Sequence, residues 1–160
     1  MKRQALIGTI AGLAFATGPA TAEIMAEQVA FTEYGEIEQS LSGTPGDPAA
    51  GREVMASRAL GNCVACHMVS DMSDIPFHGE VGPMLDGAGD RWTEAQLRGI
   101  VANAKMTFEG TIMPSYYKKS GYIRPGNAFT GKAATPEQLE TLLTAQQVED
   151  VVAYLMTLTE

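Results

Sequence analysis

Both cysteines of this 160-residue chain and one of its two histidines fall within five consecutive positions, the stretch CVACH at 63–67. A zinc site needs four ligands, or three and a water, and residues this close together in the chain cannot provide that tetrahedron by themselves. A thioredoxin-like redox pair needs a strand–helix–strand context, which the flanking sequence lacks. Covalent haem attachment needs two thiols for the vinyl groups and an adjacent His for the iron, and the motif contains all three. We therefore predict one haem c, bound covalently by Cys63 and Cys66 with His67 as an axial iron ligand; an accidental or disulfide-bonded pair is the alternative.

The first 22 residues have the pattern of an export signal. Lys2 and Arg3 form a short positive region, an apolar run covers residues 5–16, and the stretch ATA ending at residue 22 is a small-residue cleavage site. The apolar run is shorter than the roughly 20 residues that a membrane span needs, and no later segment approaches that length. We therefore expect a signal peptide at 1–22 and a periplasmic mature chain with no membrane span, beginning near Glu23. A retained N-terminal anchor is the alternative.

Charge is distributed unevenly along the mature chain. The full sequence has a formal net charge of -8, and loss of two basic residues with the signal peptide makes it -10. Seven basic and two acidic residues lie between 91 and 132, whereas the rest of the mature chain has two basic residues against seventeen acidic ones. So acidic a protein is not expected to bind nucleic acid. The basic stretch fits a surface that steers an anionic substrate or an acidic protein partner, or else a solvated surface with no partner.

The mature chain divides at a stretch rich in glycine and proline, residues 43–46. Before it, residues 23–45 mix apolar and acidic side chains without helical spacing. They are expected to form an N-terminal extension, and composition leaves open whether it packs on its own domain, stays mobile or contacts a partner. After it, Asp47 followed by Pro48 is a helix start, and we expect a helix that runs to about residue 60. This helix opens a domain of residues 46–160.

The rest of the domain carries further helix signals and no strand pattern. Capping-box sequences at 93–96 and 144–147 each predict the start of a helix, the first ending near Lys105, and a short helix is expected from 135–138. In the last helix, five apolar residues have the spacing of one buried face: Val148, Val151, Val152, Leu155 and Met156. The sequence therefore predicts an all-α domain whose core includes the haem.

The residue at the sixth iron position decides between electron transfer and chemistry on a small ligand. Met113 lies in a glycine-containing loop, where Pro114 keeps its backbone out of helix, and such a loop can lay a thioether across the far face of a haem. Met106, at a helix end, and His78, in the loop after the cysteine motif, are weaker alternatives. A His/Met pair saturates the iron and so predicts electron transfer rather than binding of oxygen or peroxide.

The order of these motifs resembles that of class I cytochromes c. In that family a Gly-Pro pair follows the cysteine motif, and the proline carbonyl holds the haem His, which would be Pro83 here. The first and last helices of the family cross at a small residue and an aromatic one, which correspond to Gly51 and Tyr154. Gly51 lies twelve positions before Cys63, further than in the short mitochondrial type. The resemblance implies a class I cytochrome c-like helical fold with an N-terminal extension.

Arg91 and Trp92 are candidate donors to a haem propionate, because a guanidinium and an indole N–H are both hydrogen-bond donors. A solvated Arg next to a Trp in the core is the alternative.

A longer resemblance covers most of the mature chain. The stretches DIPFHGEVGPMLDGAGDRW, NAKMTFEGTIMPSYY, RPGNAFTGKA and LTAQQVEDVVAYLMTL are similar to the X-subunit family of the sulfur-oxidising (Sox) pathway. The resemblance implies a periplasmic heterodimer with a SoxA-type cytochrome. That complex, an L-cysteine S-thiosulfotransferase, oxidatively joins thiosulfate to a cysteine of the carrier SoxYZ. The X subunit passes the electrons to a soluble cytochrome c.

This chain has no third cysteine to serve as a sulfur nucleophile, so within such an enzyme we expect it to relay electrons and to supply no catalytic residue. Two other classes of function stay open. One is a free class I electron shuttle with no catalytic partner. The other is a gas-binding or peroxidatic haem protein, which needs an open sixth position.

Overall fold

Helices from the two ends of the domain cross at its centre: α1 (Pro48–Ala56) and α4 (Ala145–Thr157). A Cβ atom added to Gly51 of α1 would lie 1.9 Å from the carbonyl oxygen of Asp150 and 3.0 Å from the Cβ of Tyr154, both in α4. Because no side chain fits in that space, the two helices approach this closely only with glycine at the crossing. The expected crossing of Gly51 with Tyr154 is confirmed.

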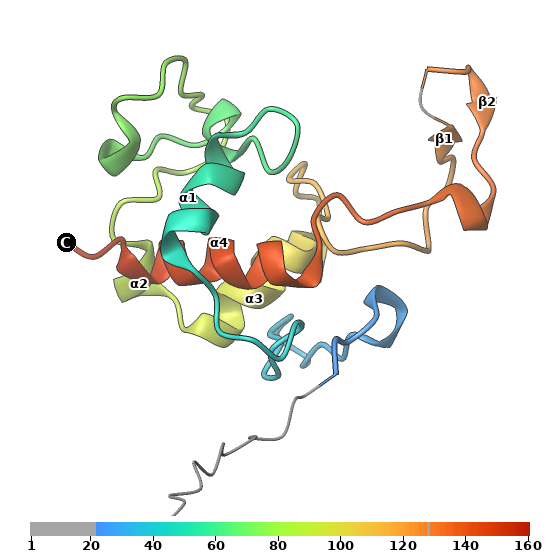
Figure 1. Ribbon diagram of the computed structural model, residues 1–160, viewed down its shortest axis with the longest axis horizontal. Coiled ribbons are helices and arrows are strands. Elements are labelled where there is room, and N and C mark those ends of the chain that lie inside the picture. Colours follow the sequence, from blue (N-terminus) through green and yellow to red (C-terminus); the bar gives the residue numbers. More distant parts are fainter. Residues whose placement is uncertain (1–21, 128) are drawn as a thin grey trace, which may run out of the picture.

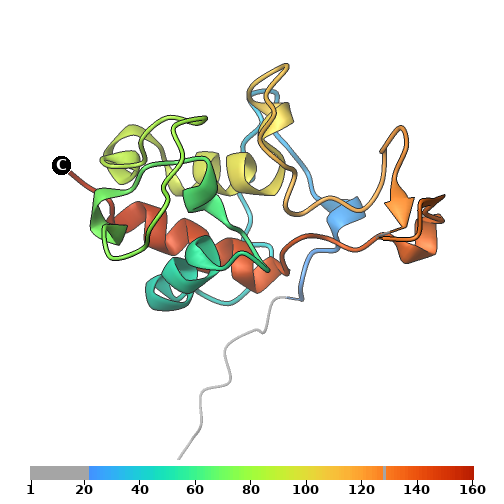
Figure 2. The ribbon, with the colours of Figure 1, turned by 90° about the horizontal axis from the view of Figure 1, so that it is seen from above.

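The computed structural model describes residues 22–127 and 129–160, and Figures 1 and 2 show it in two views at right angles. The predicted signal peptide, 1–22, lies outside these residues except for Ala22. Within the described ranges, no helix is both long enough and apolar enough to cross a membrane.

The start of α1 is as predicted, and its end is not. The Asp47 side chain accepts a hydrogen bond from the Ala49 N–H at 2.9 Å, with Pro48 in the first turn. The helix ends at Ala56 rather than near residue 60, because the backbone of Ser57 is extended. The chain then folds back so that the Gly61 N–H donates to the Val54 carbonyl at 3.1 Å. This reversal delivers the cysteine motif beside α1.

The other helices follow the capping signals closely. α3 (Glu94–Asn103) and α4 both begin with complete capping boxes, and a 3-10 turn, Ala104–Met106, extends α3 to the expected end. A short helix not expected from the sequence, α2 (Ala88–Arg91), precedes α3. The apolar face of α4 is buried as predicted, although Met156 is only half-buried. The core therefore lies between α1, α3 and α4.

The N-terminal extension packs on its own domain. Its residues Ile37 and Leu41 are buried in the core. The buried Arg98 of α3 donates to the Ile37 carbonyl and to Glu149 Oε1 of α4, each at 2.9 Å. The same carboxylate oxygen accepts the Leu41 N–H at 2.6 Å. One buried ion pair thus joins the extension to two helices.

The segment 118–142 departs from the helical body. Two short strands within it, β1 (Gly126–Asn127) and β2 (Lys132–Ala133), pair antiparallel, Gly126 with Ala133 and Asn127 with Lys132. Both views show this hairpin standing away from the helices (Figures 1 and 2). The sequence indicated no strand here, because strands of two residues have no periodicity to detect.

Candidate haem-binding site

The cysteine motif is wound into a single tight turn. Asn62 has a left-handed backbone with φ of 47°, a conformation that Asn tolerates better than most residues, and a 3-10 turn, Cys63–Ala65, follows it. The His67 N–H donates to the Cys63 carbonyl at 3.0 Å. Both cysteines are free thiols, with Cys63 half-buried and Cys66 exposed. The turn therefore places two thiols and an imidazole on one short loop.

The predicted partner of the imidazole lies against it. His67 Nδ1 is 2.7 Å from the carbonyl oxygen of Pro83. Because a carbonyl can only accept, Nδ1 carries the proton and the lone pair of Nε2 is left free for a metal. The backbone of Gly82 lies directly on the ring, since a Cβ there would be 2.3 Å from His67 Cε1. The Gly82-Pro83 pair thus fixes both the orientation and the tautomer of His67.

A buried tyrosine connects the cysteine motif to the loop that contains Met113. The Tyr116 hydroxyl donates to the Gly61 carbonyl at 2.8 Å, and the phenol lies beside Cys63. Burial raises the pKa of the Cys63 thiol to about 12 and raises that of the Tyr116 phenol as well. No local sequence pattern predicts this contact, because Gly61 lies 55 positions before Tyr116.

The backbone around Met113 is tied to the end of α3. Its carbonyl accepts from Lys105 Nζ at 2.5 Å, and its N–H donates to Thr111 Oγ1 at 3.3 Å. The Tyr117 N–H donates to the Ala102 carbonyl at 3.0 Å. The Met113 side chain is half-buried and packs against the core. Hydrogen bonds therefore fix the loop that contains Met113 to the end of α3.

The two weaker candidates for the sixth iron ligand, Met106 and His78, have other surroundings in this structure. Met106 is 47% exposed and lines a separate cavity. His78 Nδ1 accepts the Val69 N–H at 3.2 Å, which braces the loop after the cysteine motif. Within the described part of the chain, the buried Nε2 of His78 has no hydrogen-bond partner.

Arg91 and Trp92 have other partners in this structure. The Arg91 guanidinium donates to the Asp86 carbonyl at 2.5 Å and to the Met84 carbonyl at 3.2 Å, which closes the preceding loop. The Trp92 indole meets Phe108 edge-on, with ring centres 6.0 Å apart. Their contact with a haem propionate stays a prediction.

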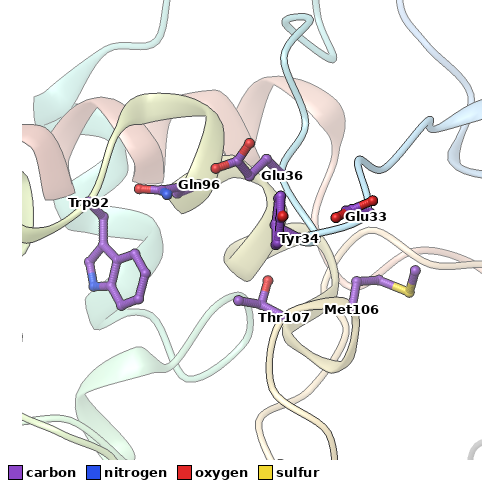
Figure 3. A pocket seen from close by; sticks show the side chains of 7 residues that line it. All are labelled: Glu33, Tyr34, Glu36, Trp92, Gln96, Met106 and Thr107. Atoms are coloured by element: carbon purple, nitrogen blue, oxygen red, sulfur yellow. The ribbon is translucent and has the colours of Figure 1, made fainter.

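Trp92 also lines a cavity of about 430 Å³ between the N-terminal extension and the two ends of α3 (Figure 3). None of the predicted haem ligands lines this cavity. Its lining consists of Glu33, Tyr34, Glu36, Trp92, Gln96, Met106 and Thr107.

The residues of the motif fit a covalently bound haem c. Two thiols and a correctly protonated imidazole are the donor set that such a haem needs, and the bare backbone of Gly82 makes room for the ring of His67. By contrast, no group of three or more His, Cys, Asp or Glu side chains in the described ranges is arranged to hold a metal ion.

This helical fold and this site define a c-type cytochrome. The family model described as Cytochrome c matches residues 48–159, and the chain belongs to that family. The predicted all-α cytochrome c fold is confirmed, and with the single Cys-x-x-Cys motif at 63–66 the family gives one covalent haem c.

Among solved structures, the chain is similar to a chain of "Crystal structure of SoxXA from P. pantotrophus", with 57% identity and a TM-score of 0.82. That match covers 87% of this chain and 100% of the other. A more distant one is the c-type cytochrome SorU from Sinorhizobium meliloti, with 23% identity and a TM-score of 0.40 over 70% of this chain and 90% of that one. A comparison with curated proteins gave no match.

Proposed function

We propose that this chain is the electron-accepting subunit of a SoxXA-type complex, which oxidatively joins thiosulfate to a cysteine of the carrier SoxYZ in the periplasm. The observation that carries the proposal is the 57% identity over the full length of a chain from a SoxXA crystal structure. Both cysteines here belong to the haem motif, so no thiol of this chain is left to react with sulfur compounds. The bond-forming chemistry therefore belongs to the SoxA-type partner.

Each S–S bond formed between a thiol and thiosulfate releases two electrons and one proton. When bound, haem supplies a one-electron iron couple. In this proposal Cys63 and Cys66 would hold the group through thioether bonds, and His67 and Met113 would ligate its iron. Pro83 keeps the imidazole in one orientation, which limits the rearrangement that each electron transfer requires. The electrons then leave one at a time to a soluble cytochrome c.

A His/Met pair also argues against the gas-binding and peroxidatic alternatives. Lys105 and Thr111 hold the backbone of Met113 at its carbonyl and its N–H. A ligand held by a braced loop is displaced less readily by small molecules than one on a loose loop. This favours electron relay over chemistry at the iron.

The basic surface is smaller than the sequence indicated. Of the seven basic residues between 91 and 132, Arg98 is buried against Glu149, and Lys119 pairs with Glu140 at 3.2 Å. Arg91 is used to close its own loop. A bond to a carbonyl does not neutralise a charge, so any attraction for an acidic partner rests on the five cations without a carboxylate partner in the described ranges: Arg91, Lys105, Lys118, Arg124 and Lys132.

Affinity purification of the mature protein from its native periplasm tests this proposal. A stoichiometric second cytochrome that stays bound through moderate salt is expected. Recovery of a lone, fully active monomer would instead indicate a free electron shuttle. The N-terminal extension does not decide between the two, because its residues 37–41 are already used within this domain.

A further inference from the structure

The segment 118–142 leaves the helical body and returns to it without joining the core. Its base is closed by the Leu143 N–H, which donates to the Tyr116 carbonyl at 3.0 Å. Among its described residues, 118–127 and 129–142, none is buried. A loop of this length without a buried residue adds nothing to the hydrophobic core, and long loops in compact domains are usually either functional or flexible linkers.

The segment nevertheless has a defined internal structure. The β1–β2 hairpin is extended by the Ala134 N–H, which donates to the Pro125 carbonyl at 2.9 Å. Nearer the base, the Tyr122 hydroxyl donates to the Lys118 carbonyl at 2.9 Å, and Lys118 Nζ lies 4.9 Å from the centre of the Tyr122 ring. A preorganised arm of this kind loses less conformational entropy on binding than a flexible one.

Large apolar side chains stand out on this arm. Ile123 is 96% exposed and Phe129 is fully exposed. Phe129 also has a φ of 60°, an uncommon backbone conformation for a bulky residue and one that structures retain mainly at functional sites. Exposed apolar side chains of this size on an internally hydrogen-bonded arm are typical of a protein–protein interface.

We propose that the described residues of this segment, 118–127 and 129–142, form a clasp that holds the SoxA-type partner subunit, with Ile123 and Phe129 as its two anchors. This inference rests on the proposed function. Apolar anchors suit a permanent subunit better than a transient electron acceptor, whose contact is small. Arg124 and Lys132 lie on the same arm of an otherwise acidic chain, so the partner surface is expected to be an apolar pocket with an acidic rim.

The clasp lies next to the loop of the proposed haem ligand Met113, which suits transfer of electrons from the partner subunit to this chain's haem. Its base begins at Tyr116 and Tyr117, directly after the Met113 loop, and both tyrosines are buried. A subunit held by the clasp is thereby anchored to the same braced segment that carries the proposed sixth ligand.

The test is coexpression of the full chain with its SoxA subunit, followed by measurement of the dissociation constant of the holoprotein pair. The double variant Ile123→Asp/Phe129→Asp is expected to weaken the pair about 30-fold or more, as loss of two interface anchors does. Its visible spectrum should match that of the wild type, because neither residue contacts the core. Tyr34→Asp is the control: it places one negative charge, half the charge change of the double variant, at a 71% exposed aromatic residue on the N-terminal extension, and it should leave binding unchanged.

The outcomes separate the two proposals. If the wild-type chain does not bind the SoxA subunit at all, the proposed function fails, and the clasp with it. If the wild type binds and the double variant binds equally well, only the clasp is refuted. Weakening by Tyr34→Asp instead would assign the contact to the extension. A homodimer of the wild type that the double variant splits would show that a second copy of this chain occupies the clasp, which also overturns the inference.

Discussion

Nδ1 of His67 lies 2.7 Å from the carbonyl oxygen of Pro83, while the backbone of Gly82 rests on the same imidazole ring. The two contacts act together: the Pro83 carbonyl fixes the tautomer of His67, and Gly82, which has no side chain, leaves room for the imidazole ring. Nε2, the nitrogen that we propose as the iron ligand, is thereby held at a fixed orientation by two neighbouring residues.

Gly82→Ala is expected to displace His67. The new Cβ would lie 2.3 Å from Cε1 and 2.7 Å from Nδ1, so the ring or the loop must move. Overpacking of this kind costs about 1–3 kcal/mol in the free energy of unfolding. A lower yield of holoprotein and a shifted reduction potential should accompany it. Gly126→Ala is the control, because the nearest atom to its Cβ is 3.9 Å away; equal behaviour of the two variants would refute this role of Gly82.

Met113→Ala should remove the methionine ligand of the oxidised iron. The expected results are loss of the methionine-to-iron absorption band, a lower reduction potential and faster binding of added imidazole. Met106→Ala removes the other methionine considered as a ligand, and its spectrum should match that of the wild type. A spectrum that changes in Met106→Ala and not in Met113→Ala would reverse the assignment.

Arg98→Met is expected to destabilise the protein strongly. It leaves Glu149 buried without its cation, and breaking one side of a buried ion pair costs about 3–5 kcal/mol. Urea unfolding of the holoprotein measures this loss, and proteolysis should cut the released N-terminal extension sooner. Lys119→Met breaks the surface pair with Glu140 and should cost less than about 1 kcal/mol. Similar losses in the two variants would contradict the buried role of Arg98.

Asp86 should make stability depend on pH in the acidic range. Its carboxylate accepts the Ser70 N–H at 2.8 Å, and the Ser70 hydroxyl, this N–H and Arg91 lower its pKa below the ordinary value of 3.8. The pKa of Asp86 is lower in the folded protein than in the unfolded chain. Its carboxylate therefore stabilises the fold fully at pH values above the unfolded pKa, and this stabilisation is lost as the pH falls through the folded pKa.

The difference in unfolding free energy between wild type and Asp86→Asn should therefore be less than about 1 kcal/mol at neutral pH, since the group is largely solvated, and should disappear in acid. Ser70→Ala keeps the backbone donor and should give a smaller effect. A difference that grows as pH falls would have the wrong sign for this contact.

Local signals predicted much of this molecule. The caps at Thr93 and Thr144 and the apolar face of α4 are set by residues within one or two turns of each other, and they form as expected. The cysteine motif, likewise, is a short chemical pattern. These features need no knowledge of the distant chain.

Contacts between distant residues were beyond sequence reasoning. The N-terminal extension is fixed by a hydrogen bond from Arg98 to the Ile37 carbonyl, two residues that are 61 positions apart, and no local sequence pattern predicts this contact. The same contact removes Arg98 from the surface, so counting charges along the chain overestimated the basic face. The early end of α1 has a local cause: the chain folds back after Ser57, and the Gly61 N–H donates to the Val54 carbonyl seven positions earlier.

The central claim, that this chain accepts electrons from thiosulfate oxidation, is tested most directly by following its haem absorbance under anaerobic conditions. The pair formed with SoxA is mixed with SoxYZ and thiosulfate. We predict reduction of this chain's haem that requires thiosulfate, SoxYZ and SoxA together, and none when the chain is alone with thiosulfate. A haem that dithionite reduces but the complete mixture leaves oxidised, or one that thiosulfate reduces equally fast without SoxA, would contradict it.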